Sequence, residues 1–573
     1  MTTATAPTFT ASVTGPQRLV THGYQHCLRR NYLIQILNDD LGVLSVGVSK
    51  AAKAKFQQAR LANWCDQGIL PRAAFYQLVL NWIKQGNTTS SIAAEADLCK
   101  PSPGYCLAYA VDIGLTFEGF QSLDSHTQLT DQFRKKTPAF AQGAPLRASS
   151  RLGDTALSAP YTWEERYQKG GIHAVLVVHA ATGTVEGACA GFQAFESAVL
   201  TQLGWSIHAP LTLMHADWIE ESTILDSPKE VHFGYIDGLS APRFRGVDSP
   251  ARLRKEEDFN IHDPGELLLG YPRNDKSNPW AVPGAYAQES GPTPPNPQPA
   301  REVYGDFFRD GSFGVLRKMK QNVPEFETYI KEQATVGLGN ESLFYKIAWL
   351  KAKLLGRWPN GERVGEVVDA TDRRLPDPKD FPKPDADIKE EALLNRMKPV
   401  NNNPTSAGNN NFNHHKADPH GYGCPFGAHI RRMNPRDDPV VPILRRPLLR
   451  RGVPYGAKYP EGKYDDVERG LLGLFFCASI EEQFEHILGN WTNNNPMGLP
   501  FAHAGKDPLV GNQDCLGNTF EIPKRGRPPL ILKGLPVFVE TRGTCYAFFP
   551  SVQALLKIAR GGIVSSTAFL EGM

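Results

Sequence analysis

The stretch CPFGAHIRRMNPR occupies residues 424–436. It presents one imidazole, that of His429, after small and apolar residues and just before a group of arginines. An axial ligand to a haem iron needs these parts: an imidazole nitrogen for the metal, small residues where the porphyrin approaches, and cations for its propionates. A histidine by itself is more often a core or surface residue, so this interpretation depends on the rest of the chain.

Two other segments carry residue types that would complement such a ligand. Residues 233–242 read FGYIDGLSAP and contain a Gly-x-x-Asp-Gly pattern around Asp237. Residues 449–456 read LRRGVPYG and contain two adjacent arginines, Arg450 and Arg451. A Gly-x-x-Asp-Gly pattern recurs by chance in a chain with 52 glycines, so the three segments together are far more specific than any one of them.

The three segments, in this order, resemble the distal GxxDG, proximal-histidine and distal-arginine motifs of the dye-decolorising (DyP-type) haem peroxidases. Further segments resemble the family over roughly residues 110–560, among them RLGD at 151–154, GELLLGYP at 265–272 and KDPLVG at 506–511. The resemblance implies an α+β fold of two ferredoxin-like domains, with antiparallel sheets covered by helices, of the dimeric α+β barrel type. It also implies one haem b per chain, held largely by the second domain.

The resemblance assigns a role to three side chains. His429 is expected to be the axial ligand of the haem iron, and so both the cofactor-binding and the metal-binding residue. Asp237 is expected to move a proton on the opposite haem face, with its pKa raised towards neutrality by burial. Arg450 is expected to stabilise developing negative charge there, with Arg451 as the alternative.

This centre predicts a peroxidase that reduces hydrogen peroxide and oxidises an organic donor, such as a dye or a phenol, in one-electron steps. The alternative is a haem carrier or sensor of the same fold. Asp237 and Arg450 favour the enzyme, because a carrier needs neither. Bulky donors would pass electrons through a surface tyrosine or tryptophan, for which Tyr455 and Trp491 are candidates. The oligomeric state stays open.

The proximal imidazole also needs a hydrogen-bond acceptor for its Nδ1–H, so that Nε2 faces the metal. By resemblance to the family this acid comes from a later helix. Three glutamates on the predicted helix Ile480–Trp491 are candidates, namely Glu481, Glu482 and Glu485, and the sequence does not choose among them.

A zinc site is a competing interpretation of the region before His429. One cysteine and three histidines lie close together in the sequence: His414, His415, His420 and Cys424. Their spacing matches no closed structural zinc pattern, and the asparagine-rich surroundings favour a loop.

Composition excludes several classes of partner. The chain has 573 residues with 62 basic and 60 acidic side chains, so no overall field attracts nucleic acid or a membrane surface. Nine cysteines without a CxxC pair indicate reduced thiols. The N-terminus lacks the basic and apolar regions of a signal peptide, and the apolar runs are too short to span a membrane. We therefore predict a cytoplasmic protein.

The chain is predicted to have three parts, of which the resemblance implies the character of the last two: an N-terminal tail (1–30), a first ferredoxin-like domain with the GxxDG motif (31–300), and a second, haem-binding one (301–573). The role of the first 110 residues stays open. Predicted strands lie at Gly171–His179, Gly311–Arg317, Gly470–Ala478, Val537–Glu540 and Tyr546–Phe549. Predicted helices lie at Ala73–Lys84, Phe192–Leu203, Val323–Ala334, Ile480–Trp491 and Ser551–Ile558.

Overall fold

The structure is a computed structural model. The residues it describes are 15–21, 28–37, 55, 58–59, 68–84, 109–123, 128–180, 185–203, 219–223, 230–254, 260–280, 305–336, 342–364, 410, 412–437, 446–460, 462, 464–494, 506–513, 518–524 and 526–560. Among the described helices, none has the length and apolar character that a membrane span requires.

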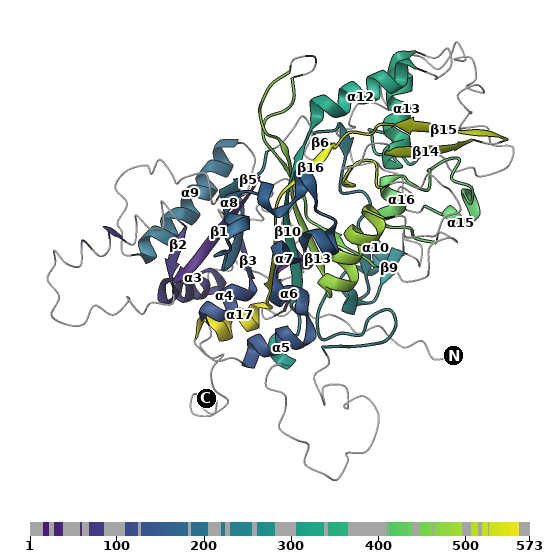
Figure 1. Cartoon of the computed structure of the whole chain (residues 1–573). Helices are drawn as coiled ribbons and strands as arrows, with labels where there is room; N and C mark the ends of the chain where they lie inside the picture. The colour runs from purple at the N-terminus through teal and green to yellow at the C-terminus, as the bar shows by residue number, and fades with distance from the viewer. Residues whose placement is uncertain are drawn as a thin grey trace, which may run out of the picture.

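A ten-stranded sheet runs through the centre of the molecule (Figure 1). Its main path is β11-β13-β10-β16-β3-β4-β1-β2, with β12 paired to β13 and β5 paired to β1. The bounds are β1 Leu28–Leu37, β2 Ile69–Pro71, β3 Tyr109–Leu115, β4 Ala174–Ala180, β5 Ile219–Glu221, β10 Ser312–Gln321, β11 Leu449–Arg450, β12 Val453–Tyr455, β13 Gly470–Cys477 and β16 Val539–Phe549. All pairs in this sheet are antiparallel except β1–β2.

Three two-stranded ladders lie outside the large sheet. They are β6 Glu230–Val231 with β7 Tyr235–Ile236, β8 Arg243–Phe244 with β9 Ile261–His262, and β14 Thr519–Lys524 with β15 Arg527–Lys533.

Helices flank the sheet and connect its strands (Figure 1). The α-helices are α1 Arg18–Thr21, α3 Arg72–Lys84, α4 Phe117–Leu123, α5 Gln128–Lys136, α6 Pro138–Gln142, α7 Ala144–Arg147, α8 Glu165–Lys169, α9 Val185–Gln202, α10 Pro250–Leu253, α11 Gly305–Phe308, α12 Val323–Thr335, α13 Leu343–Leu355, α15 His414–Ala417, α16 His429–Met433 and α17 Val552–Ala559. The π-helical segments are η1 Ala148–Leu152, η7 Ile480–Glu485 and η8 Ile487–Thr492. Short 3₁₀ turns are η2 Ala156–Ser158, η3 Pro160–Thr162 and η6 Pro264–Glu266.

The two halves of the sheet join where β16 pairs with β3, at Phe548 and Leu115. Side chains alternate across a strand, so Phe548 and its neighbour Phe549 point to opposite faces. The ring centroids of Phe548 and Phe133 are 5.4 Å apart. On the opposite face, the ring centroids of Phe549 and Phe476 are 5.0 Å apart. The junction is therefore packed with aromatic rings on both sides.

The structure confirms the α+β class and places both halves in one continuous sheet. The N-terminal half contains β1 to β5, and the C-terminal half contains β10 to β13 and β16. The halves are also tied together at their ends. Helix α17 packs against α3, and the Gln17 side chain donates hydrogen bonds to the carbonyls of Ile113 and Pro550. The division into 1–30, 31–300 and 301–573 stays a prediction, and residues 1–14 and 22–27 lie outside the described part.

Most predicted elements are confirmed, including the strands at β4, β10 and β13 and the helices at α3, α9, α12 and α17. The prediction of two separate strands at Val537–Glu540 and Tyr546–Phe549 was wrong, because one strand, β16, covers Val539–Phe549. The intervening Gly543 suggests a break, yet it makes room for a ring. A Cβ at Gly543 would lie 2.1 Å from Tyr167 Cδ2.

The sheet junction yields a prediction about stability. A Cβ at Gly114 of β3 would lie 2.7 Å from the Phe549 ring, so Gly114→Ala should displace this ring and destabilise the protein by about 1–3 kcal/mol. The measurement is chemical unfolding. Because Phe549→Leu removes the obstructing ring atoms, Gly114→Ala should cost clearly less in that background. Equal costs in both backgrounds would contradict this account of the junction.

Candidate haem site

A cavity lies against the C-terminal half of the sheet and collects residues that are far apart in the sequence. The volume of this cavity is about 240 Å³. His429, Asp237 and Arg450, the three predicted site residues, all line it. Most of the remaining wall is apolar and includes Leu239, Leu355, Ile430, Met433, Leu448, Leu471, Phe475, Phe484, Ile487, Leu488, Leu509 and Val510. This is the lining that a flat, largely apolar macrocycle requires.

His429 begins helix α16, and a buried carboxylate holds its ring. The Nδ1 atom lies 3.0 Å from Oδ2 of Asp507, whose side chain is fully buried. The other oxygen, Oδ1, accepts the backbone N–H groups of Leu509 and Val510, each at 2.9 Å. Burial alone would raise the pKa of Asp507, but His429, the Val510 N–H and the charge of Arg432 hold it below its usual value. The contact leaves Nε2 of His429 available to a metal.

The loop before His429 is held by buried charges. The Asp418 carboxylate accepts the backbone N–H groups of Gly423 and Cys424. Nζ of the buried Lys353 donates to the carbonyls of Tyr422 and Gly423, at 2.7 and 2.6 Å. Because these groups fix the chain directly before α16, they set where the His429 imidazole enters the cavity.

Asp237 and Arg450, which line the same cavity, form an ion pair. Nη2 of Arg450 donates to Oδ1 of Asp237 at 3.1 Å, and the backbone N–H of Gly238 donates to the same oxygen at 2.7 Å. Gly234 and Gly238 both have φ of +79°, a conformation that favours glycine and shapes the turn around Asp237. The Asp237 side chain is 39% exposed and lines the cavity.

The expected direction of the Asp237 pKa shift was wrong. Burial does raise the pKa of this carboxyl, as the sequence suggested. Arg450, the Gly238 N–H and His429 outweigh burial, and together they place the pKa below its usual value. Asp237 is therefore a carboxylate at neutral pH, which suits a group that must accept a proton first.

Another part of the cavity carries an excess of positive charge. Arg357 and Arg436 both line it and are almost fully buried. The described hydrogen bonds of Arg357 go to neutral oxygens, those of the Ser240 hydroxyl and the Gly361 carbonyl. Burial first, and then repulsion from Arg436, Arg363 and Arg450, lowers the pKa of Arg357. Guanidinium groups crowded in this way are stabilised by a bound dianion, so the residues fit the two propionates of a haem.

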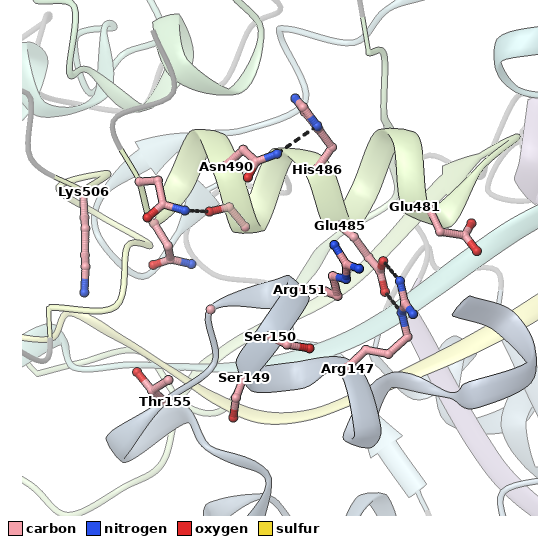
Figure 2. A pocket seen from close by; sticks show the side chains of 14 residues that line it. Arg147, Ser149, Ser150, Arg151, Thr155, Glu481, Glu485, His486, Asn490 and Lys506 are labelled. Carbon is pink, nitrogen blue, oxygen red and sulfur yellow. Dashed lines mark hydrogen bonds and ion pairs between the residues drawn. The ribbon is translucent and has the colours of Figure 1, made fainter. Parts of the chain in front are cut away.

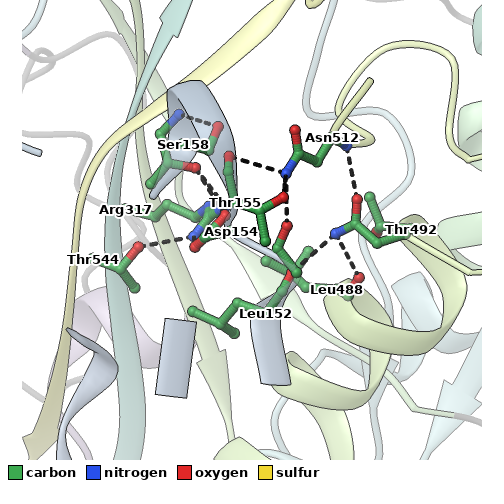
Figure 3. Close-up of polar contacts among 12 residues, drawn as sticks. Leu152, Asp154, Thr155, Ser158, Arg317, Leu488, Thr492, Asn512 and Thr544 are labelled. Carbon is green, nitrogen blue, oxygen red and sulfur yellow. Dashed lines mark hydrogen bonds and ion pairs between the residues drawn. The ribbon is translucent and has the colours of Figure 1, made fainter. Parts of the chain in front are cut away.

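A polar network borders the same cavity (Figure 3). The Arg317 guanidinium of β10 donates to both oxygens of Asp154, at 2.8 and 2.6 Å, and to Thr541 and Thr544. Beside it, the Asn512 amide donates to the carbonyls of Gly153 and Thr155. The network ties the segment after η1 to the sheet and to the loop that carries Asp507.

None of the three glutamates considered for the proximal acid contacts His429. Glu481 accepts the Ala139 N–H at 2.7 Å, and Glu485 accepts two hydrogen bonds from Arg147 at 2.5 Å. Glu482 pairs with Arg273. The acid is Asp507 instead. The sequence did contain a signal for it, because Asp507 lies in KDPLVG, one of the segments that resemble the family.

Arg451, considered above in place of Arg450, points elsewhere. Its guanidinium donates to the backbone carbonyls of Leu19 and Thr21, each at 3.0 Å. It therefore anchors the segment that includes α1, and of the two arginines only Arg450 lines the cavity.

The zinc site and the electron relay have different outcomes. The described residues contain no group of three or more His, Cys, Asp or Glu side chains placed to hold a metal ion, so the zinc interpretation of His414, His415, His420 and Cys424 was wrong.

Tyr455 and Trp491 are both buried, and neither lines the haem cavity. Their role as an electron relay stays a prediction.

Comparison with known proteins gives a consistent result, although no family model matches the chain. The chain is 25% identical over 478 residues to dye-decolorizing peroxidase msp1 of Mycetinis scorodonius, covering 78% of this chain and 76% of the relative. It is 28% identical to the multifunctional dye peroxidase DyP2 of an Amycolatopsis species, covering 78% and 81%. A dye-decolorizing peroxidase solved with 2,6-dimethoxyphenol has the same fold, with a TM-score of 0.64 at 20% identity and coverage of 96% and 100%.

The proximal contact yields a prediction. Asp507→Asn should weaken haem binding or activity by about 10- to 100-fold, because partners of a ligating imidazole fix its tautomer and its basicity. The measurement is titration of the haem-free protein with haem, followed at the Soret band. Glu481→Gln is the control, since this glutamate bonds to α6. The assignment fails if Glu481→Gln produces the loss and Asp507→Asn does not.

Proposed function

We propose that the chain is a dye-decolorising-type peroxidase and that His429, Asp237 and Arg450 form its catalytic centre around one haem b. One observation supports this assignment above all. Segments of the chain around residues 237, 429, 450 and 507 converge on a single cavity, which is lined by both an Asp-held imidazole and a carboxylate–guanidinium pair.

Each group around the cavity has a task. When bound, the haem supplies an iron that accepts the two oxidising equivalents of hydrogen peroxide and passes them to an organic donor in one-electron steps. His429 would ligate the iron through Nε2 while Asp507 accepts its Nδ1–H. Arg357 and Arg436 would pair with the propionates. The apolar wall excludes water and strengthens every charge interaction inside.

Asp237 is arranged to move the proton of the peroxide. Both of the described hydrogen bonds of Asp237 end on Oδ1, so Oδ2 can accept a proton from one oxygen of hydrogen peroxide. Asp237 Oδ2 can then deliver this proton to the other peroxide oxygen, which leaves as water. The Arg450 guanidinium stabilises the negative charge that develops on the departing oxygen. Hydrogen peroxide and an organic donor are therefore the partners of this site.

The first test concerns the metal ligand. His429→Ala should abolish both the Soret band of the bound haem and the peroxide-dependent oxidation of a phenol, because the site loses its nitrogen ligand. His415→Ala, an exposed histidine of α15, is the matched control and should leave both unchanged. Wild-type protein that binds haem, yet oxidises phenol no faster than free haem does, would instead be a carrier.

The second test uses pH. Arg450 lowers the pKa of Asp237, so the carboxylate stays ionised, and the peroxide reaction stays fast, well into the acid range. Arg450→Leu removes this charge and raises the pKa of Asp237. The acid limb of kcat/KM for peroxide should then move to higher pH, with a loss of about 100-fold or more at the optimum. Arg450→Lys should keep the limb near its original position. An unmoved limb in Arg450→Leu would exclude Asp237 as the proton acceptor.

A further inference from the structure

The ring of Phe412 lies against two of the arginines that line the haem cavity. The guanidinium carbon of Arg436 is 4.4 Å from the ring centroid of Phe412, and that of Arg357 is 4.8 Å from it. A third guanidinium, that of Arg363, lies 5.7 Å from the same centroid. Phe412 is 5% exposed and does not line the cavity itself. One buried ring thus contacts two cations of the cavity from behind its lining.

Hydrogen bonds on both sides fix the position of this ring. The Phe412 N–H donates to the carbonyl of Asn410 at 3.0 Å, and Asn410 Oδ1 accepts from Nη2 of Arg436 at 2.9 Å. After Phe412 the chain enters α15, where the N–H of His414 donates to Oδ1 of Asp437 at 2.8 Å. Asp437 directly follows Arg436 in the sequence. The ring and the Arg436 guanidinium therefore belong to two segments that are bonded to each other before and after the contact.

The ring stabilises the cations without neutralising them. The described hydrogen bonds of Arg357 go to the Ser240 hydroxyl and the Gly361 carbonyl, and Arg357 makes no ion pair among the described residues. Figure 2 shows the contrasting case of Arg147, whose guanidinium donates two hydrogen bonds to the carboxylate of Glu485. An aromatic face attracts a guanidinium through its quadrupole and carries no net charge. The positive charge of Arg357 is thus left available to an anion.

Mutual repulsion makes this support necessary. Burial first, and then the charges of Arg436 and Arg363, lowers the pKa of Arg357, so the guanidinium groups oppose one another across a region with little water. Arg436 also has φ of +56°, a conformation that residues other than glycine rarely adopt. Without a bound dianion, both effects favour conformations in which the guanidinium groups move apart. The aromatic ring is the described group that contacts both of them.

We propose that Phe412 is a positioning residue for the haem: its ring holds the guanidinium groups of Arg357 and Arg436 in the haem-free protein so that both can pair with the propionates. The inference rests on the proposed function, because it takes haem as the occupant of the cavity. Order that the ring provides beforehand does not have to be imposed by the ligand, and this strengthens binding. Phe412 therefore sets the affinity for the propionate end of the haem and does not touch the reacting atoms.

The test replaces Phe412 by phenylalanines that carry one, two or three ring fluorines, which weaken the negative face of the ring with little change of shape. The Kd of haem, measured by titration of the haem-free protein at the Soret band, should rise with each fluorine, to about tenfold in all. The Kd of haem dimethyl ester, whose propionates are uncharged, should stay constant. Phe412→Leu should also raise the Kd of haem about tenfold, since it keeps an apolar side chain and removes the ring.

The control is the same fluorine series at Phe538. Its ring is also buried, lines neither cavity and has no cation over it among the described residues, and it packs 5.1 Å from the Phe326 ring, centroid to centroid. Fluorination there should leave the Kd of haem unchanged. A series at this position that matches the series at Phe412 would reduce the effect to general packing and overturn the proposal.

Two further results would overturn it: a constant Kd of haem across the series at Phe412, or an equal rise for haem and its dimethyl ester. Failure of the proposed function gives a different result. Wild-type protein would then give no Soret band with haem, which removes this inference as well, or would bind haem without oxidising a phenol when peroxide is added. A tightly bound haem with a flat fluorine series would overturn the role of Phe412 alone.

Discussion

The contact between His429 and Asp507 is the interaction on which the site depends. It joins residues 78 positions apart, and its carboxylate has no access to solvent. A buried carboxylate is costly unless it is hydrogen-bonded, and Asp507 accepts from the imidazole and from two backbone N–H groups. Its own N–H donates to the Thr492 carbonyl at the end of η8. One residue thus orients the His429 imidazole and anchors the end of η8.

The charges around the haem cavity are distributed by function. The carboxylate–guanidinium pair of Asp237 and Arg450 is neutral as a whole. When Asp237 accepts a proton, the pair carries one positive charge, that of Arg450, which stabilises the negative charge left on the ligand. The region of Arg357 and Arg436 has surplus positive charge, which lowers the pKa of Arg357 and is relieved by a bound anion. A dianion bound there would therefore stabilise this region without engaging the Asp237–Arg450 pair.

The sequence predicted the parts of the site that local motifs carry, and it missed those that depend on packing. Asp237, Arg450 and His429, which line one cavity, were singled out because each lies in a recognisable segment. Asp507 was missed because no periodicity shows which carboxylate reaches an imidazole 78 residues away. The glutamates of η7 fit the expected helix, yet Glu485 faces away from His429, towards Arg147. The Asp237 pKa direction was missed for a similar reason, because the position of the Arg450 guanidinium is set by the pairing of β11 with β13.

The segment formed by η7 and η8 gives the haem cavity one of its walls. Phe484 and Leu488 lie four positions apart and both line that cavity, and the ring centroid of Phe484 lies 5.3 Å from that of Phe475. Glu485, the next residue after Phe484, does not line it, and its carboxylate is held by Arg147 and by the Tyr546 hydroxyl. The segment therefore contributes apolar surface to the cavity while its buried carboxylate is paired elsewhere, which explains why a glutamate expected near His429 does not reach it.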